Sequence, residues 1–159
     1  MKKMNIFISH QHNDAPSIKR VIDFIEKKGE IKVRDSSIYE EKKPNKATNP
    51  DYIKSLIRAQ MDWAGTVVVL IGKETKNSDY VDYEINYAGK HDKKIIGVFI
   101  PGTDDNDIPN SFKEHGSALC RLRTESLNRA LIGETNFENS NNDSRDKPIG
   151  FTIKRYLCN

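Results

Sequence analysis

The sequence predicts an α/β protein with a doubly wound, mostly parallel sheet and helices on both of its faces. Residues 67–71 and 95–100 are almost continuously apolar, which is typical of strands covered on both sides in a parallel sheet. Short strand patterns alternate with amphipathic helix patterns over residues 5–100. Such alternation, joined by right-handed crossovers, builds a doubly wound sheet. A chain of 159 residues is expected to form one domain, residues 1–159.

The first strand and helix occupy the start of the chain. Residues 5–9 form the strand, and a polar loop leads to a helix with Asp14 as its N-cap and Pro16 in its first turn. Gly29 ends that helix because glycine readily adopts the left-handed conformation found after helices. Residues 31–35 then form a short second strand. The core-facing positions of the helix are Ile18, Val21, Ile22 and Ile25.

A charged loop over residues 36–47 separates the second strand from the second helix. Thr48 or Asn49 caps this helix, which has Pro50 at its start and ends near Trp63. Its expected buried positions are Tyr52, Ile53, Leu56, Ile57 and Gln60.

Glu84 lies on the helix that follows the strand at 67–71 and is our candidate catalytic residue. Tyr80, Tyr83, Glu84 and Tyr87 have the spacing of one helix face, and Val81, Ile85 and Ala88 form the neighbouring apolar stripe. We expect the Glu84 carboxylate where the two stripes meet, partly desolvated and surrounded by aromatic rings. That setting raises the pKa of a carboxyl group and suits chemistry at a sugar or a base.

The pattern is weaker after the fourth strand at 95–100. We expect a loop over residues 103–116, a fifth strand over 118–122 and a helix over 125–131. Residues 136–147 are rich in Asn, Asp and Ser and are expected to form a surface loop. Residues 149–157 fit either an edge strand or a last helix.

The expected binding site follows from the strand order. Ligands of doubly wound proteins bind outside the carboxyl ends of the strands, where the order reverses, and in a flavodoxin-like order that point lies between the first and third strands. Residues 9–14 and 72–84 follow these two strands, and residues 35–37 flank them. The most polar and aromatic segments thus converge on one crevice.

Composition excludes several classes of protein. The net charge of +3 is small and scattered, so we expect no nucleic-acid partner. No run of eighteen apolar residues is present, so we expect no membrane contact. The N-terminus enters a strand pattern without a signal-peptide segment, and Cys120 and Cys158 form no CxxC pair. A cytoplasmic location is expected, with both cysteines as reduced structural thiols.

Chemical motifs are equally sparse. The chain has no GxGxxG, GxxxxGK[ST] or GxSxG sequence, which leaves dinucleotide redox chemistry, P-loop phosphate transfer and serine hydrolysis without support. His10 and His12 form an HxH pair near Asp14, but no second histidine pair completes a metal-binding set. We expect a polar loop there, and neither a metal nor a cofactor.

The residues resemble a known family. Phe7-Ile8-Ser9-His10, Asp35-Ser36-Ser37, Trp63 before the apolar strand, and Tyr80-Val81-Asp82-Tyr83-Glu84-Ile85 occur in the order seen in TIR-like domains. Over residues 4–100 the chain resembles the bacterial TIR-like domain of the Thoeris antiphage defence system.

This resemblance implies a flavodoxin-like fold and cleavage of NAD+ between nicotinamide and ribose. The implied product is a cyclic ADP-ribose isomer or a related ADP-ribose conjugate, a second messenger for a separate downstream effector protein. It also leaves self-association open. By position, Glu84 corresponds to the catalytic glutamate of the family.

The chemistry of the residues agrees with that implication. Breaking an N-glycosidic bond develops positive charge on the ribose, which one carboxylate can stabilise. Cationic nicotinamide leaves without a general acid, so NAD+ is a substrate that needs no metal. Aromatic surfaces for the rings would come from Phe7, Trp63, Tyr80 and Tyr83. Polar contacts would come from Ser9, His10, Asp35 and Ser36.

Three other functions remain open. A non-catalytic TIR-like scaffold would use the same fold for protein contacts and would not need Glu84. A nucleoside deoxyribosyltransferase-like enzyme also has a doubly wound sheet, uses a glutamate as nucleophile at an anomeric carbon, and would act on deoxynucleosides. A response-regulator-like receiver is the weakest alternative, because Gly72 stands where a phosphoacceptor aspartate should end the third strand.

Overall fold

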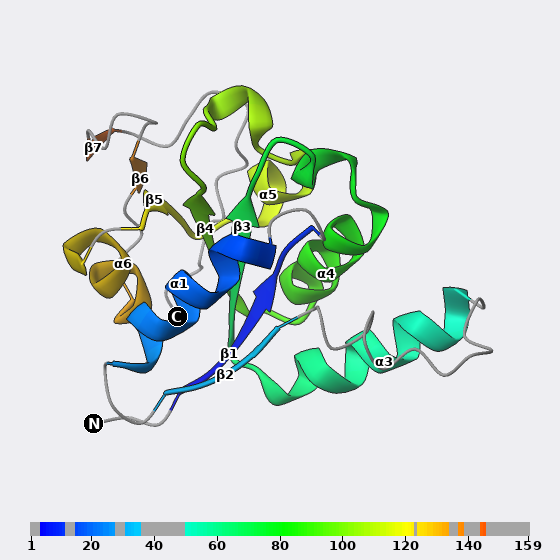
Figure 1. The fold of residues 1–159 in the computed structure, drawn as a ribbon. Helices are drawn as coiled ribbons and strands as arrows, with labels where there is room; N and C mark the ends of the chain where they lie inside the picture. The colour runs from blue at the N-terminus through cyan, green and yellow to red at the C-terminus, as the bar shows by residue number, and fades with distance from the viewer. Residues whose placement is uncertain are drawn as a thin grey trace, which may run out of the picture.

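The fold was obtained as a computed structural model (Figure 1). It describes residues 4–11, 15–27, 31–35, 50–122, 124–133, 137–138 and 144–145. Its strands are β1 (Met4–Ser9), β2 (Ile31–Asp35), β3 (Thr66–Ile71), β4 (Lys94–Phe99), β5 (Ala118–Arg121), β6 (Phe137–Glu138) and β7 (Ser144–Arg145). Its α-helices are α1 (Ala15–Glu26), α3 (Pro50–Trp63), α4 (Asp79–Lys90), α5 (Asn110–His115) and α6 (Thr124–Leu131). Two short 3-10 helices are η2 (Thr75–Asn77) and η3 (Asp105–Asp107).

The strands form one sheet in the order β2-β1-β3-β4-β5-β6-β7. Neighbours from β2 to β6 are parallel, and β7 is antiparallel to β6. The order reverses between β1 and β3, which is the flavodoxin-like arrangement. The predicted doubly wound, mostly parallel α/β fold is therefore confirmed.

Helices lie on both faces of the sheet (Figure 1), and each face packs against its helices through a core layer of buried side chains. Val67, Val69 and Ile71 of β3 pack in the layer that contains buried residues of α3, α4 and α5. Val68 and Leu70 point the other way and pack in the layer with α1 and α6. Because side chains alternate along a strand, the continuous apolar run of β3 supplies both layers.

Local interactions fix the segment that leads from β3 to α4. The Thr75 hydroxyl accepts a hydrogen bond from Gly72 N at 2.8 Å and donates to Leu70 O at 3.1 Å. The Ser78 side chain then caps α4 by accepting a bond from Val81 N at 3.3 Å. These bonds define where α4 starts and hence the position of Glu84 relative to the carboxyl ends of the strands.

Helix α4 packs against α5 with little space between them. A Cβ atom built on Gly89 would lie 2.2 Å from Nδ1 of the His115 ring. Any side chain at position 89 would overlap that ring, so glycine allows this close approach of α4 and α5.

Several elements differ from the sequence-based expectation. The segment 103–116, expected to be a loop, contains η3 and α5, and the expected loop 136–147 contains β6 and β7. These elements have two to six residues, too few for a periodic pattern. Tyr52, expected to be buried, is 43% exposed near the start of α3.

The remaining predicted elements agree within a residue or two, including α1 over Pro16. Outside the described residues lie the predicted caps Asp14, Gly29 and Thr48 or Asn49, the loop 36–47 and the segment 149–157. In the described part of the chain, no helix combines the length and apolarity needed to cross a membrane.

Candidate active site

Glu84 is buried at the carboxyl end of β1. Its side chain is only 1% exposed, and it shares the inner face of α4 with Val81, Ile85 and Ala88. The Ser9 hydroxyl, at the end of β1, donates a hydrogen bond to Glu84 Oε1 at 3.3 Å. The two residues are brought together from opposite sides of the point at which the strand order reverses.

Burial dominates the electrostatic setting of Glu84. Burial raises the pKa of the Glu84 carboxyl well above its ordinary value, and the hydrogen bond from Ser9 lowers it in part. The second oxygen, Oε2, has no hydrogen-bond partner in the described part of the chain. A buried polar atom without a partner costs about 1–3 kcal/mol, and such costs are often found at sites of chemistry.

Phe7, Ser9 and His10 form the β1 side of the site. Phe7 is fully buried two residues before Ser9, in the same core layer as α4, so it lies beneath the site as part of the core. His10 follows Ser9 directly and is 6% exposed, with Nδ1 at 3.1 Å from Gln11 O. Asp35 ends the neighbouring strand, but its side chain and all of Ser36 lie outside the described residues.

The tyrosines are arranged differently from the expectation. Tyr80 is 39% exposed one helical turn before Glu84. The Tyr83 hydroxyl accepts a hydrogen bond from Arg58 of α3 at 3.1 Å. Tyr87 donates to Asp62 of α3 at 2.6 Å, which raises the pKa of Tyr87 to about 12. Tyr83 and Tyr87 therefore face α3, and Glu84 belongs to the apolar stripe, fully buried instead of at its border.

Trp63 is not brought to Glu84. Its carbonyl accepts a hydrogen bond from Asn5 Nδ2 at 3.1 Å, and the Arg34 guanidinium lies 4.1 Å from the centre of its ring. Asn5 precedes Ser9 by four residues, a strand length of about 13 Å. The Trp63 backbone thus lies beside the amino end of β1 and its ring packs on Arg34, so the expected contact of the ring with a substrate stays a prediction.

An ion pair and hydrogen bonds that the sequence did not predict join the segments that follow β3 and β4. Lys73, after β3, forms an ion pair with Asp107 of η3 at 3.1 Å, and Lys76 donates to Asn106 O at 2.9 Å. Asp107 also accepts from Asp104 N at 2.9 Å. Although burial acts to raise it, these bonds hold the pKa of Asp107 below its ordinary value. The Asp-x-x-Asp spacing of a capping box was the available sequence signal.

The strand order and the helices on both faces are those of a TIR-like domain. Residues 7–105, well over half of the chain, match the family described as Thoeris protein ThsB, TIR-like domain. The chain belongs to this family.

Two solved structures align with this chain at low sequence identity. A conserved protein from Enterococcus faecalis V583 aligns with a TM-score of 0.52 and 12% identity, over 64% of this chain and 66% of that one. The TIR domains of the activated Roq1 resistosome, which directly recognizes the pathogen effector XopQ, align with a TM-score of 0.42 and 16% identity. That alignment covers 61% of this chain and 57% of the other, so this chain spans less than two thirds of either structure. No curated protein matches the sequence.

Proposed function

We propose that the protein cleaves NAD+ at the bond between nicotinamide and ribose, with Glu84 as the catalytic residue. The proposed product is a cyclic ADP-ribose-type molecule or an ADP-ribose conjugate, acting as a second messenger in bacterial antiphage defence. The observation that carries the proposal is the buried Glu84 carboxyl group, held by Ser9 at the strand-order reversal of a chain in the ThsB family.

The proposed reaction uses the carboxyl group as an electrostatic stabiliser. The C–N bond breaks with its electron pair leaving on the nicotinamide nitrogen, which turns the cationic ring into neutral nicotinamide. Positive charge then develops on the ribose, and a carboxylate beside it lowers the energy of the transition state. A nitrogen of the adenine ring of the same molecule then bonds to the anomeric carbon and closes a cyclic product, whereas a separate nucleophilic molecule bonding there gives an ADP-ribose conjugate.

The raised pKa of Glu84 fits this use of the residue. In the free protein, burial favours the neutral carboxyl form. A cationic nicotinamide ring bound nearby favours the carboxylate, because an opposite charge lowers the pKa of an acid. Substrate binding would therefore generate the charge where the reaction needs it.

Access to Glu84 requires a rearrangement. With a side chain that is 1% exposed, the carboxyl group cannot touch a substrate until its neighbours move. We expect low turnover by the isolated protein and higher turnover once a trigger, such as self-association or an infection signal, opens the site.

Mass-spectrometric product analysis of NAD+ tests the proposal. Concentrated wild-type protein, Glu84→Gln and Asp82→Asn would be compared as pure proteins and in lysates from infected and uninfected cells. Asp82 is an exposed acidic residue of the same helix, bonded to Asn86 at 3.3 Å, so Asp82→Asn makes the same charge change away from the buried site.

Nicotinamide and an ADP-ribose product that appear with wild type and Asp82→Asn, and vanish with Glu84→Gln, would support NAD+ cleavage. No Glu84-dependent product under any condition would contradict it and favour a scaffold. Turnover of deoxynucleosides in place of NAD+ would assign the same glutamate to a transferase of the deoxyribosyltransferase kind.

A further inference from the structure

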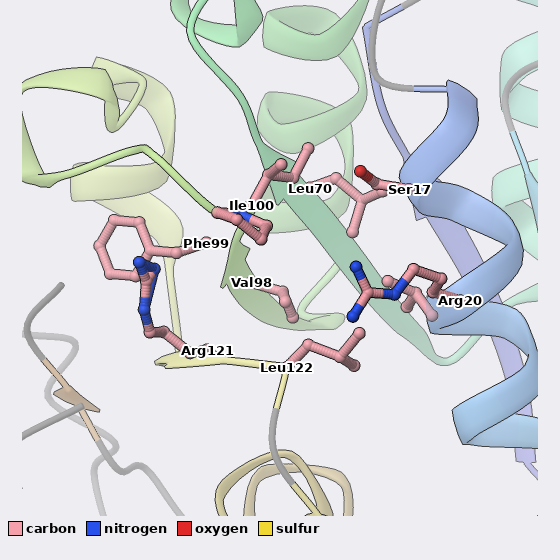
Figure 2. Close-up of a pocket in the computed structure, with 10 residues that line it drawn as sticks. Ser17, Arg20, Leu70, Val98, Phe99, Ile100, Arg121 and Leu122 are labelled. Atoms are coloured by element: carbon pink, nitrogen blue, oxygen red, sulfur yellow. The ribbon is translucent and has the colours of Figure 1, made fainter. Parts of the chain in front are cut away.

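A cavity lies on the opposite face of the sheet from Glu84. It has a volume of about 310 Å³ and lies between the first half of α1 and the carboxyl ends of β3, β4 and β5 (Figure 2). Its volume falls within the range of small-molecule sites, roughly 300–1,000 Å³. Doubly wound proteins bind ligands at this end of the strands.

The cavity is separate from the site around Glu84. Leu70 and Val98, which line it, belong to the core layer between the sheet and helices α1 and α6. Val81 and Ile85, the neighbours of Glu84 on α4, belong to the layer on the other face. A ligand in this cavity would be divided from Glu84 by the sheet itself.

The charged groups of the cavity are all positive. Arg20 reaches into it from α1, and Arg121 lies beside Phe99 at the other end, with its guanidinium carbon 5.9 Å from the centre of the ring (Figure 2). None of the ten lining residues is acidic. The first turn of α1, which the predicted cap Asp14 precedes, contains no acidic residue of its own.

The remaining lining gives the cavity an apolar floor and a hydroxyl group. Leu70 and Val98 are almost completely buried, and Leu122 is partly buried beside them. The Ser17 hydroxyl lies in the first turns of α1, on the same helix as Arg20. Two guanidinium groups, a hydroxyl and an apolar floor suit a molecule with an anionic end and a flat or apolar body.

We propose that this cavity binds a phosphate-bearing organic molecule of nucleotide size. The phosphate would lie between Arg20, Ser17 and the start of α1, since guanidinium groups and helix N-termini both bind phosphate oxygens. The body of the ligand would cover Leu70, Val98 and Leu122 and extend toward Arg121. This inference does not depend on the activity proposed for Glu84.

Isothermal titration with AMP, adenosine and inorganic phosphate tests the assignment. We expect saturable AMP binding that Arg20→Gln and Arg121→Gln each weaken at least tenfold. Lys19→Gln is the matched control, because Lys19 is an exposed cation of the same helix outside the cavity lining; it should change AMP affinity less than twofold. Adenosine and inorganic phosphate should each bind at least tenfold more weakly than AMP.

A nuclear magnetic resonance titration locates the ligand. AMP should shift the amide signals of Ser17 and Leu122 in the wild type and in Ser9→Ala alike, which separates this cavity from the Glu84 site. Three outcomes would overturn the proposal: no saturable AMP binding, AMP affinity unchanged by Arg20→Gln, or inorganic phosphate binding as tightly as AMP. Thermal melts would establish that each variant is folded, and a lack of NAD+ turnover would leave the binding result unaffected.

Discussion

Replacing Glu84 by glutamine should change how the stability of the protein depends on pH. The folded protein holds the Glu84 proton more tightly than the unfolded chain, because burial raises the pKa of this carboxyl well above its ordinary value of 4.5. Between the ordinary pKa and the raised one, the folded state therefore binds more protons, and wild-type stability falls as the pH rises. The glutamine side chain does not titrate, so the stability of the variant lacks the part of the decline with rising pH that Glu84 causes in the wild type.

The size of the effect follows from one proton. Through that pH window, the unfolding free energy of Glu84→Gln should rise relative to wild type by up to about 1.4 kcal/mol per pH unit. Below the window the difference should be constant, since Glu84 is protonated in both states. Above the raised pKa it should level off again.

Urea unfolding of both proteins at closely spaced values between pH 4 and pH 8 measures this difference. Other titrating groups are common to the two proteins and largely cancel. The Asp82→Asn protein provides the control for an acid-to-amide change at an exposed position of the same helix. A flat difference for Glu84→Gln across the range would refute the reasoning, since it would mean that Glu84 titrates alike in the folded and unfolded states.

Three further substitutions test other parts of the structure. Ser9→Ala removes the one hydrogen bond that lowers the pKa of Glu84, so the pH window should extend upward, and stability should fall by about 1 kcal/mol, both measured by urea unfolding. Gly89→Ala places a methyl group against the His115 ring and should cost about 1–3 kcal/mol in thermal or urea unfolding. Asp107→Asn should cost about 1 kcal/mol at pH 7; because the folded-state pKa of Asp107 is lowered, the loss should shrink as the pH falls below 3.8.

Matched controls sharpen these comparisons. Gly65→Ala adds the same methyl group where no atom lies within 4 Å, so it should change stability much less than Gly89→Ala. Equal effects of the two would contradict the tight packing of α4 against α5. A loss with Asp107→Asn that is the same at pH 3 and pH 7 would show that the ion pair with Lys73 is not its cause. A Ser9→Ala protein whose pH window is unchanged would remove Ser9 as a partner of Glu84.

The sequence predicted the central sheet well because its strands have strong local signals. The continuous apolar runs of β3 and β4 are readable without tertiary information, and so is the helix that carries Glu84. The complete burial of the Glu84 side chain could not be predicted from the sequence. Spacing on a helix places a residue on one face, but the width of the buried stripe depends on what packs against that face. The partners of Tyr83 and Trp63 were unpredictable for the same reason, since contacts with Arg58 of α3 and with Arg34 determine where their rings lie.

Long-range contacts explain the other omissions. Arg20 and Arg121 lie about a hundred residues apart in sequence. They line opposite ends of one cavity because the fold places α1 beside the carboxyl ends of β3, β4 and β5. Helix α5 and strands β6 and β7 are too short for periodicity and are formed through contacts with the rest of the sheet and core. The sequence could therefore suggest Glu84 as a site residue, but it contained no local sign of the cavity between α1 and the strand ends.

The close approach of Gly89 to His115 bears on how the candidate active site could open. Because even a Cβ atom on Gly89 would overlap the His115 ring, sliding or rolling α4 past α5 would have to displace that ring. The two helices should then travel as a single body in any rearrangement, and the parts that uncover Glu84 must lie elsewhere around it. Glu84 would then keep its place on α4 relative to α5, and the residues that cover its carboxyl group would be the ones that move.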